Sequence, residues 1–306
     1  MPLYIGIDVG GTAIKGAVIG ADGKLYGEDS VPTATGEGIV NCIVTLVNRL
    51  RKMNSEEVKG VGIGCAGVID SEGGKVVLAR NLSLENFPLV KLVRDRIDLP
   101  VKITNDANVA ALGEAKFGAG KDYKNSILVT LGTGVGGGIV IDGKLFEGNK
   151  SAGAEIGHMV IERGGEMCSC GRRGCFEAYS SATALKRQTK RAMEEDAGSA
   201  MWRKYTSDTV TGKTAFEYMD SDTAAREVVD RYIEYLACAL SNLANIFRPE
   251  VIMLGGGISK EGERLTAPLQ KILDREIFAA AYAPVKVTVA TLGSLAGAYG
   301  AAALFI

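Results

Sequence analysis

The chain has 306 residues with a formal net charge of −1, and 46% of its residues are hydrophobic and 23% charged. This composition is typical of a globular protein, and the length predicts about two domains, each large enough for its own core. No basic block predicts a nucleic-acid partner, and no apolar run approaches the roughly 20 residues that cross a bilayer. Because the chain starts without a charged and apolar leader, we expect a cytosolic protein.

Residues 3–19 predict a strand, a glycine-rich loop and a second strand. The loop gathers a carboxylate, small residues, a hydroxyl and a lysine: Asp8, Gly10, Gly11, Thr12 and Lys15. Loop N–H groups and a threonine hydroxyl can hold phosphate oxygens, and an aspartate can hold a hydrated Mg²⁺ ion. The alternative is a tight hairpin with a capping aspartate, so this segment alone leaves both interpretations open.

The same plan recurs at residues 127–143, where an apolar run, a glycine-rich loop and a second apolar run precede an Asp-Gly turn. This loop includes Gly132, Thr133 and Gly134. Its G-x-G-x-x-G pattern marks a dinucleotide site only when a helix follows, and here a strand and a hairpin turn follow. The segment therefore disfavours an NAD-linked oxidoreductase. Two such loops, one in each domain, predict a clamp on both sides of a phosphate chain.

Predicted strands and helices alternate along the rest of the chain, which indicates an α/β fold. Asn105 and Asp106 lie between the predicted strand 101–104 and a helix that continues to Phe117. An aspartate at this position is either the N-cap of the helix or a general base in a cleft, and both can hold at once. A third glycine run, Gly255, Gly256 and Gly257, follows the predicted strand 251–254.

The only histidine is followed by three closely spaced cysteines: His158, Cys168, Cys170 and Cys175. In a reducing compartment such a cluster indicates metal binding rather than disulfides. Three thiolates and one imidazole complete the closed tetrahedral set that is typical of structural zinc. Glu155 and Glu177 flank this segment, either as surface carboxylates or as acceptors for the hydroxyl groups of a ligand.

Together these segments resemble the ROK family of bacterial sugar kinases and regulators. The resemblance is carried, in the family's order, by D-V-G-G-T-A-I-K (8–15), N-D-A-N (105–108), L-G-T-G-V-G-G-G (131–138), A-E-I-G-H (154–158), C-S-C-G-R-R-G-C-F-E (168–177) and L-G-G-G-I (254–258). It implies an actin-like, two-domain ATPase fold in which sugar and ATP meet in the cleft. We expect one domain from residues 1–117 and 293–306 and a larger one from 118–292.

The resemblance also implies a role for each matching residue. Asp106 matches the catalytic base that takes the proton from the sugar hydroxyl. The implied sugar ligands are Asn105, Glu155, His158 and Glu177. The implied phosphate loops are Gly10–Thr12 and Gly132–Gly134, with Gly255–Gly257 on the adenosine side. His158 then has two tasks, with one ring nitrogen on zinc and the other directed at the sugar. ATP with Mg²⁺ and a structural zinc are the implied cofactors, and a homodimer is the implied assembly.

Two departures from the family bear on the substrate. Ala154 stands where the family usually has a glycine before the first sugar-binding glutamate, and residues 81–87 lack the tryptophan found in many of its glucokinases. We expect a glucokinase that makes glucose 6-phosphate, with an N-acetylmannosamine kinase or another hexose kinase as the alternative. The family also contains sugar-responsive repressors. Since the first phosphate loop begins within ten residues of Met1, we expect no DNA-binding module and no nucleic-acid partner.

Overall fold

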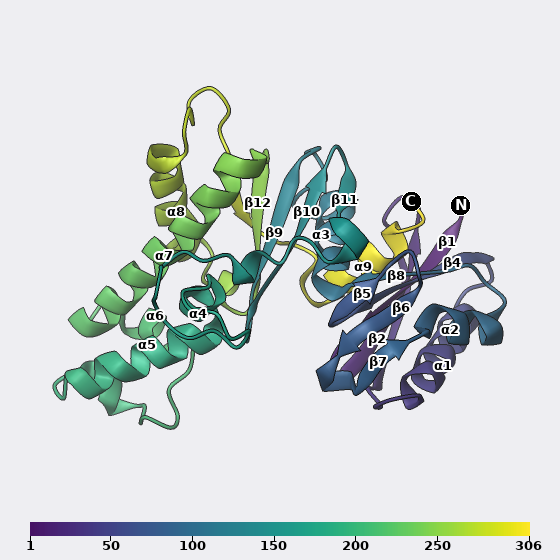
Figure 1. Ribbon diagram of the computed structural model, residues 1–306, viewed down its shortest axis with the longest axis horizontal. Coiled ribbons are helices and arrows are strands. Elements are labelled where there is room, and N and C mark those ends of the chain that lie inside the picture. Colours follow the sequence, from purple (N-terminus) through teal and green to yellow (C-terminus); the bar gives the residue numbers. More distant parts are fainter. The chain divides into compact units, whose positions relative to one another are not determined.

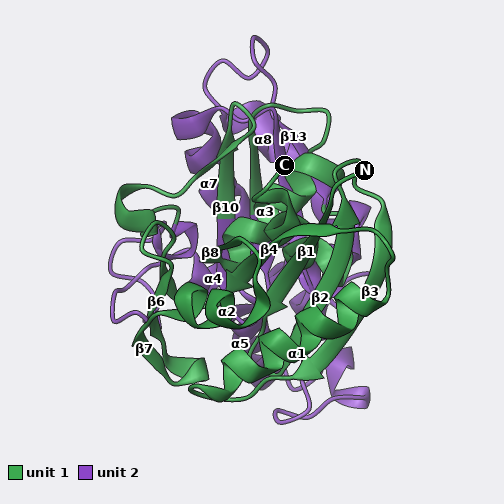
Figure 2. Cartoon of the chain, turned by 90° about the vertical axis from the view of Figure 1, so that its right-hand side faces the viewer, with its two compact units in different colours: residues 1–128, 138–154, 290–306 green, residues 129–137, 155–289 purple.

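The computed structural model describes residues 1–306, which form two compact units (Figure 2). Unit 1 comprises residues 1–128, 138–154 and 290–306, and unit 2 comprises residues 129–137 and 155–289. The expected domain boundaries near residues 117 and 292 remain a prediction. None of the helices is both long and apolar enough to span a membrane.

The expected α/β fold is confirmed by two five-stranded sheets of the same order. The first is β3-β2-β1-β4-β8, from strands Leu25–Pro32, Ala13–Gly20, Leu3–Val9, Val58–Cys65 and Val101–Asn105. The second is β11-β10-β9-β12-β13, from strands Lys144–Phe146, Val135–Ile141, Ser126–Leu131, Val251–Gly256 and Lys286–Val289. In each sheet three consecutive strands lie on one side and two later strands on the other. The sequence repeat is thus also a repeat of topology.

In unit 1, strand β1 is central and separates two kinds of pairing. It runs antiparallel to β2 and parallel to β4, and β4 runs parallel to β8. Since side chains alternate along a strand, Leu3, Ile5, Ile7 and Val9 share one face, where they join the core formed with helices α1 (Gly38–Lys52) and α2 (Leu89–Ile97). A small antiparallel sheet, β5-β6-β7, adds strands Val68–Asp70, Lys75–Ala79 and Leu84–Phe87.

The opposite face of this sheet is covered by α9 (Ala296–Ala303), which also packs against α3 (Asp106–Phe117) (Figure 1). Helix α9 is rich in small residues, so its backbone approaches the strands beneath it very closely. A Cβ atom added to Gly62 on β4 would lie 1.7 Å from the carbonyl oxygen of Ala301, and one added to Gly6 on β1 would lie equally close, at 1.7 Å, to that of Ala298. Glycine is therefore required at both contacts between strand and helix.

The buried carboxylate of Glu114, on α3, stabilises the chain segment that enters α9. It is 0% exposed and accepts hydrogen bonds from the N–H groups of Ala119, Thr291 and Leu292 at 2.9, 3.0 and 2.7 Å. The Thr291 hydroxyl donates a further bond at 3.3 Å. Four donors thus compensate the burial of this carboxylate without a lysine or arginine partner.

Unit 2 is mainly helical around the parallel pair β12 and β13. Its α-helices are α4 (Glu177–Ser180), α5 (Ala182–Glu195), α6 (Thr214–Tyr218), α7 (Thr223–Phe247) and α8 (Glu263–Glu276). Short 3₁₀ helices complete the chain: η1 (Arg80–Leu82), η2 (Asn149–Ser151), η3 (Ile156–His158), η4 (Ala200–Arg203), η5 (Ile258–Glu261) and η6 (Gly293–Leu295). Asp222 caps α7 by accepting the N–H of Ala225 at 2.8 Å, and the helix ends two residues before Pro249, which cannot continue it.

The contact at Gly62 yields a stability prediction. Gly62→Ala should lower the free energy of unfolding by about 3 kcal/mol, because the backbone of α9 must move to admit the methyl group. Gly212→Ala is the matched control, since its Cβ would meet Ala182 only at ordinary distances of 3.4 to 3.6 Å. Urea unfolding monitored by circular dichroism measures both. Equal stability of the two variants would contradict the proposed close packing of α9.

Candidate active site and metal centre

The carboxyl ends of three parallel strands in unit 1 bring two aspartates and a thiol together. Val9 pairs with Cys65 and Cys65 pairs with Asn105, so β1, β4 and β8 end side by side. Asp8 is the penultimate residue of β1, and Asp106 follows the last residue of β8. Ligand sites of parallel sheets lie at this edge, which makes it the first candidate for catalysis.

Burial raises the pKa values of all three groups, and nearby aspartate charges add to the shifts of Asp8 and Cys65. The pKa of Asp8 is raised to about 6, mainly by burial and in second place by the negative charge of Asp106. Lys15, which lies opposite Asp8 on β2, lowers it in part. Burial also raises the pKa of Asp106, although hydrogen bonds from the N–H of Ala107 and from Asn105 oppose the shift. Burial followed by the two aspartate charges raises the pKa of Cys65 to about 12. The thiol therefore stays protonated, whereas the aspartates become stronger bases than an exposed carboxylate.

Asn105, and not Asp106, is the N-cap of α3. The Asn105 side-chain oxygen accepts the N–H groups of Ala107 and Asn108 at 2.8 and 3.3 Å, and its amide donates to the carbonyl of Gly67 at 3.0 Å. The Asp106 carboxylate accepts the N–H of Ala107 at 2.9 Å, through Oδ1. This division leaves most of the Asp106 carboxylate available to a ligand, because its neighbour satisfies the helix end.

In each of the two glycine loops, the first N–H group donates a hydrogen bond to a backbone carbonyl two or three residues later. Gly10 donates to the carbonyl of Ala13 at 3.2 Å, and Gly132 donates to that of Gly134 at 3.0 Å. The next N–H groups donate to no acceptor within the chain; they belong to Gly11, Thr12, Thr133 and Gly134. Successive unpaired N–H groups in a loop form a nest for an anion such as phosphate. At the third run, Gly256 has φ of 86° and its Cβ would lie 2.4 Å from the carbonyl oxygen of Leu131, so glycine is required there.

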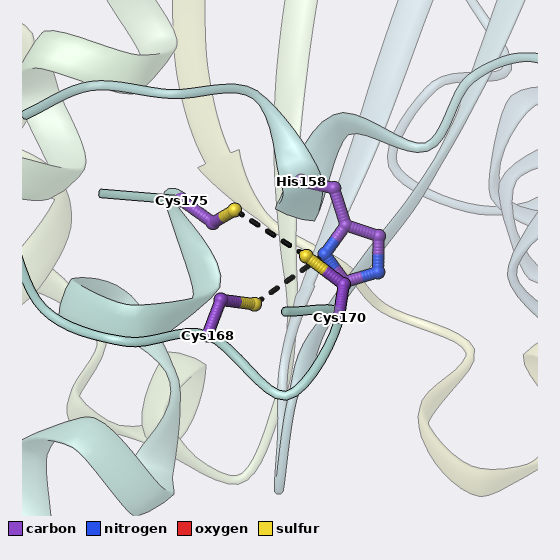
Figure 3. A group of neighbouring side chains, drawn as sticks. All are labelled: His158, Cys168, Cys170 and Cys175. Carbon is purple, nitrogen blue, oxygen red and sulfur yellow. Dashed lines mark hydrogen bonds between the residues drawn. The ribbon is translucent and has the colours of Figure 1, made fainter. Parts of the chain in front are cut away.

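In unit 2, His158 and three cysteines converge on one point (Figure 3). The four ligand atoms all lie within 4.8 Å of one another. Nδ1 of His158 lies 3.6 Å from Sγ of Cys168, and the sulfurs of Cys170 and Cys175 lie 3.7 Å apart. The other ring nitrogen of His158 points away from the sulfur atoms.

These distances fit a tetrahedral zinc ion. Bonds of about 2.3 Å to sulfur and about 2.0–2.1 Å to nitrogen place two sulfurs about 3.7 Å apart and a sulfur about 3.6 Å from the nitrogen. The donor set also suits the metal, since three thiolates and an imidazole leave no open coordination position. For Mg²⁺, the fit rests on Asp8, whose carboxylate accepts no hydrogen bond within the chain and so remains available to a hydrated cation.

Glu177 connects the cysteine loop to the second glycine loop. Its Oε1 accepts the Ser169 hydroxyl at 3.0 Å and lies 3.7 Å from Sγ of Cys168. Its Oε2 accepts the N–H of Val135 at 3.1 Å. A Cβ atom on Gly134 would lie 2.3 Å from the same Oε2. One carboxylate is therefore shared by the candidate metal centre and a candidate phosphate loop.

Glu155 shows no such link. Its side chain is exposed, and its backbone carbonyl accepts the N–H of His158 at 3.1 Å. Sequence reasoning missed the role of Ser169 and the Glu177–Val135 bond, because residues 42 positions apart give no periodic signal. It also missed that Cys65 lies beside the two aspartates, which the alignment of the strand ends alone could have indicated.

The repeated sheets, the glycine loops and the aspartates at the strand ends define the class of actin-like ATPases, here with sugar kinases as structural neighbours. The family model described as "ROK family" matches residues 4–306. The chain belongs to the ROK family, as its sequence motifs predicted.

Three relatives show how far the similarity extends. The glucokinase of Halalkalibacterium halodurans is 38% identical over 306 residues, which cover 97% of this chain and 93% of that protein. The glucokinase of Streptomyces coelicolor is 39% identical over 317 residues, covering 99% of this chain and 98% of that protein. A crystal structure of a ROK family glucokinase from Streptomyces griseus in complex with glucose and AMPPNP is 36% identical, covers 99% of this chain and 98% of that one, and has a TM-score of 0.81.

The raised pKa of Asp8 predicts how the free energy of unfolding depends on pH. Because the pKa of Asp8 is about 6 in the fold and 3.8 in the unfolded chain, protonation favours the fold, and this contribution is lost as pH rises from about 4 through about 6. The Asp8→Asn variant carries no titrating group at this position and so does not lose stability in this way. The free energy of unfolding of Asp8→Asn minus that of wild type should therefore rise over this pH range, by up to roughly 3 kcal/mol. Urea unfolding at several pH values between 4 and 7.5 measures the difference.

The control is Asp122→Asn, which changes an exposed carboxylate of the same unit. Its unfolding free energy should stay within about 0.5 kcal/mol of wild type. An Asp8→Asn difference that is constant from pH 4 to 7.5 would mean that the fold does not perturb this carboxylate.

Proposed function

We propose that the chain is a glucokinase that transfers the terminal phosphoryl group of ATP to glucose and releases glucose 6-phosphate. The observation that carries the proposal is full-length similarity to glucokinases, one of them solved with glucose and an ATP analogue. The geometry agrees with phosphoryl transfer, since nests of N–H groups suit phosphates and a partly buried aspartate suits a base. The kinases of other hexoses and the non-catalytic regulators are not favoured by these relatives.

In this proposal Asp106 is the general base. The glucose hydroxyl oxygen attacks the terminal phosphorus, the bond from that phosphorus to the bridging oxygen of ADP breaks, and the hydroxyl proton passes to Asp106. A raised pKa brings a carboxylate closer to the pKa at which it accepts a proton effectively near neutral pH. The capping bonds of Asn105 hold the start of α3 and so orient the Asp106 side chain.

The phosphate chain of ATP is assigned to the two glycine loops, Gly10–Thr12 and Gly132–Gly134, with Gly255–Gly257 on the adenosine side. Asp8 would hold Mg²⁺, which neutralises charge on the phosphates, and Lys15 opposite it adds a second positive charge. Positioning and charge neutralisation supply most of the catalysis in phosphoryl transfer, because little covalent chemistry is left for the protein.

Glucose is assigned to Asn105, Glu155, His158 and Glu177, through hydrogen bonds to its hydroxyl groups. Zinc would be held by His158, Cys168, Cys170 and Cys175, where it supplies a structural crosslink. With Nδ1 of His158 on the metal side, the other ring nitrogen is the one left to bind a hydroxyl. We further propose a cytosolic homodimer without a nucleic-acid partner, on the resemblance to the family alone.

A substrate panel tests the proposal. Purified protein is assayed for ADP release with Mg²⁺, ATP and glucose, mannose, fructose, allose or N-acetylmannosamine, and the glucose product is identified by nuclear magnetic resonance. We expect the highest kcat/KM for glucose, with the phosphate on the 6-hydroxyl. A preference of more than tenfold for another sugar, or no turnover of any, would contradict the assignment.

Asp106→Asn should lower kcat by a factor of about 10²–10⁴, because the amide keeps the shape of the side chain but cannot accept a proton. Glucose affinity, measured by calorimetry, should change little. The control is Asp122→Asn, which should keep wild-type kcat. An Asp106→Asn enzyme with more than about a tenth of the wild-type kcat would refute Asp106 as the base.

Cys170→Ser should lose zinc, lower the melting temperature and raise the KM for glucose more than the KM for ATP. The physical reason is that the loop carrying Cys168 and Ser169, both in contact with Glu177, loses its crosslink. Elemental analysis should find about one zinc per wild-type chain. Cys42→Ser, at an isolated thiol on α1, should keep the metal and both KM values. Metal-free wild-type protein would disprove the site, and an unchanged glucose KM in folded Cys170→Ser would show a purely structural crosslink.

A further inference from the structure

The chain between β11 and Glu155 forms a loop whose two ends lie close together at Glu147, Gly148 and Gly153, here called the neck of the loop. The backbone carbonyl of Glu147 accepts the N–H of Gly153 at 2.7 Å. A Cβ atom on Gly148 would lie 2.9 Å from Cα of Gly153, and one on Gly153 would lie 2.9 Å from Cα of Gly148. Because the two limbs pass this closely, the loop closes on itself at Glu147.

Three non-glycine residues of this loop have left-handed backbone conformations. Lys150, Ser151 and Ala154 have φ of 52°, 57° and 60°. Such conformations are unfavourable for residues with a Cβ atom and persist where the surrounding structure holds them. Ala154 is followed directly by Glu155, so the conformation of the loop sets the direction in which the chain reaches that residue.

The side chain of Glu147 connects the neck to two other segments of unit 1. Its Oε1 accepts the Ser71 hydroxyl at 2.7 Å and also accepts the Thr104 hydroxyl. Thr104 is 1% exposed, and its oxygen in turn accepts the amide of Asn108 at 3.4 Å. Both hydroxyls are therefore bound by one oxygen of the Glu147 carboxylate. Hydrogen bonds to a charged acceptor are stronger than bonds between neutral groups.

The two hydrogen-bond partners of Glu147, Ser71 and Thr104, lie on segments close to the proposed catalytic base and to the loop. Thr104 lies on β8, two residues before Asp106, and Ser71 directly follows β5, which packs against η2 within the loop. Glu147 is therefore where the strand that carries the proposed base, the turn after β5 and the loop that leads to Glu155 are joined.

We propose that Glu147 is a positioning residue of the glucose site: it holds the loop 148–154 in its left-handed conformation and fixes it to the end of β8. The proposal rests on the proposed glucokinase function for its effect on glucose. It assigns Glu147 no contact with the substrate, and the residue acts through the loop and through Thr104.

Kinetics and hydrogen exchange of four single variants and one double variant test it. Glu147→Ala should raise the KM for glucose about tenfold or more while the KM for ATP stays within about twofold, because the loop to Glu155 loses its attachment. Glu147→Gln should stay within about threefold of wild type, since the amide oxygen still accepts both hydroxyls. Ser71→Ala should change the glucose KM in the same direction by less, and combining it with Glu147→Ala should add nothing further. The control is Glu72→Ala, which removes an exposed carboxylate next to Ser71 and should behave as wild type.

Amide exchange of residues 148–154 supplies a readout independent of turnover. It should be faster in Glu147→Ala than in wild type, while exchange in α1 stays unchanged. Unaltered glucose KM together with unaltered loop exchange in folded Glu147→Ala would overturn the proposal. If that variant does not fold, the same two results in Ser71→Ala would overturn it. Absence of glucose turnover in wild type would instead refute the glucokinase assignment, and the exchange comparison would still decide whether Glu147 holds the loop.

Discussion

The edge of unit 1 that carries Asp8 and Asp106 holds two partly buried carboxylates that repel each other. The charge of Asp106 raises the pKa of Asp8, and Lys15 is the cation that opposes this shift. Keeping like charges together costs stability, so the surrounding structure must hold the strand ends in place. The glycine contacts of β1 and β4 with α9, and the capping of α3 by Asn105, provide that rigidity. A cation held by Asp8 would relieve this repulsion, in agreement with the proposed magnesium site.

In unit 2 the carboxylate of Glu177 joins two segments of the candidate site. It accepts one hydrogen bond from the cysteine loop and one from the end of the glycine loop. A displacement of either loop therefore shifts Glu177 and weakens its bond to the other. The closed ligand set of the candidate zinc centre suits a crosslink, and in the proposed function its effect on glucose would pass through His158 and Glu177. Gly134 illustrates the coupling, because a Cβ atom there would lie 2.3 Å from Oε2 of Glu177 and displace that carboxylate.

Much of this arrangement could be predicted from the sequence, since it depends on local patterns. The glycine loops between apolar runs, the strand–helix junction at Asn105 and the spacing of three cysteines each specify a structure within a few residues. The N-cap interpretation of Asp106 was wrong, because Asn caps a helix as well as Asp does and the side chain of Asn105, one residue earlier, takes the role. The bonds of Glu147 to Ser71 and Thr104, and of Glu114 to Thr291, join residues 76, 43 and 177 positions apart. No periodicity or motif encodes such pairs, so they were missed.

The claim on which the account depends most is that a carboxylate with a raised pKa accepts the proton from glucose. The decisive measurement is the pH dependence of kcat/KM for glucose at saturating Mg²⁺ and ATP, where Asp8, by our proposal, holds the magnesium ion and leaves Asp106 to titrate. If Asp106 is the base, kcat/KM falls on the acid side with an apparent pKa clearly above 3.8, the ordinary value for aspartate. A profile that stays flat until the pH falls below 3.8, with the protein still folded, would contradict it.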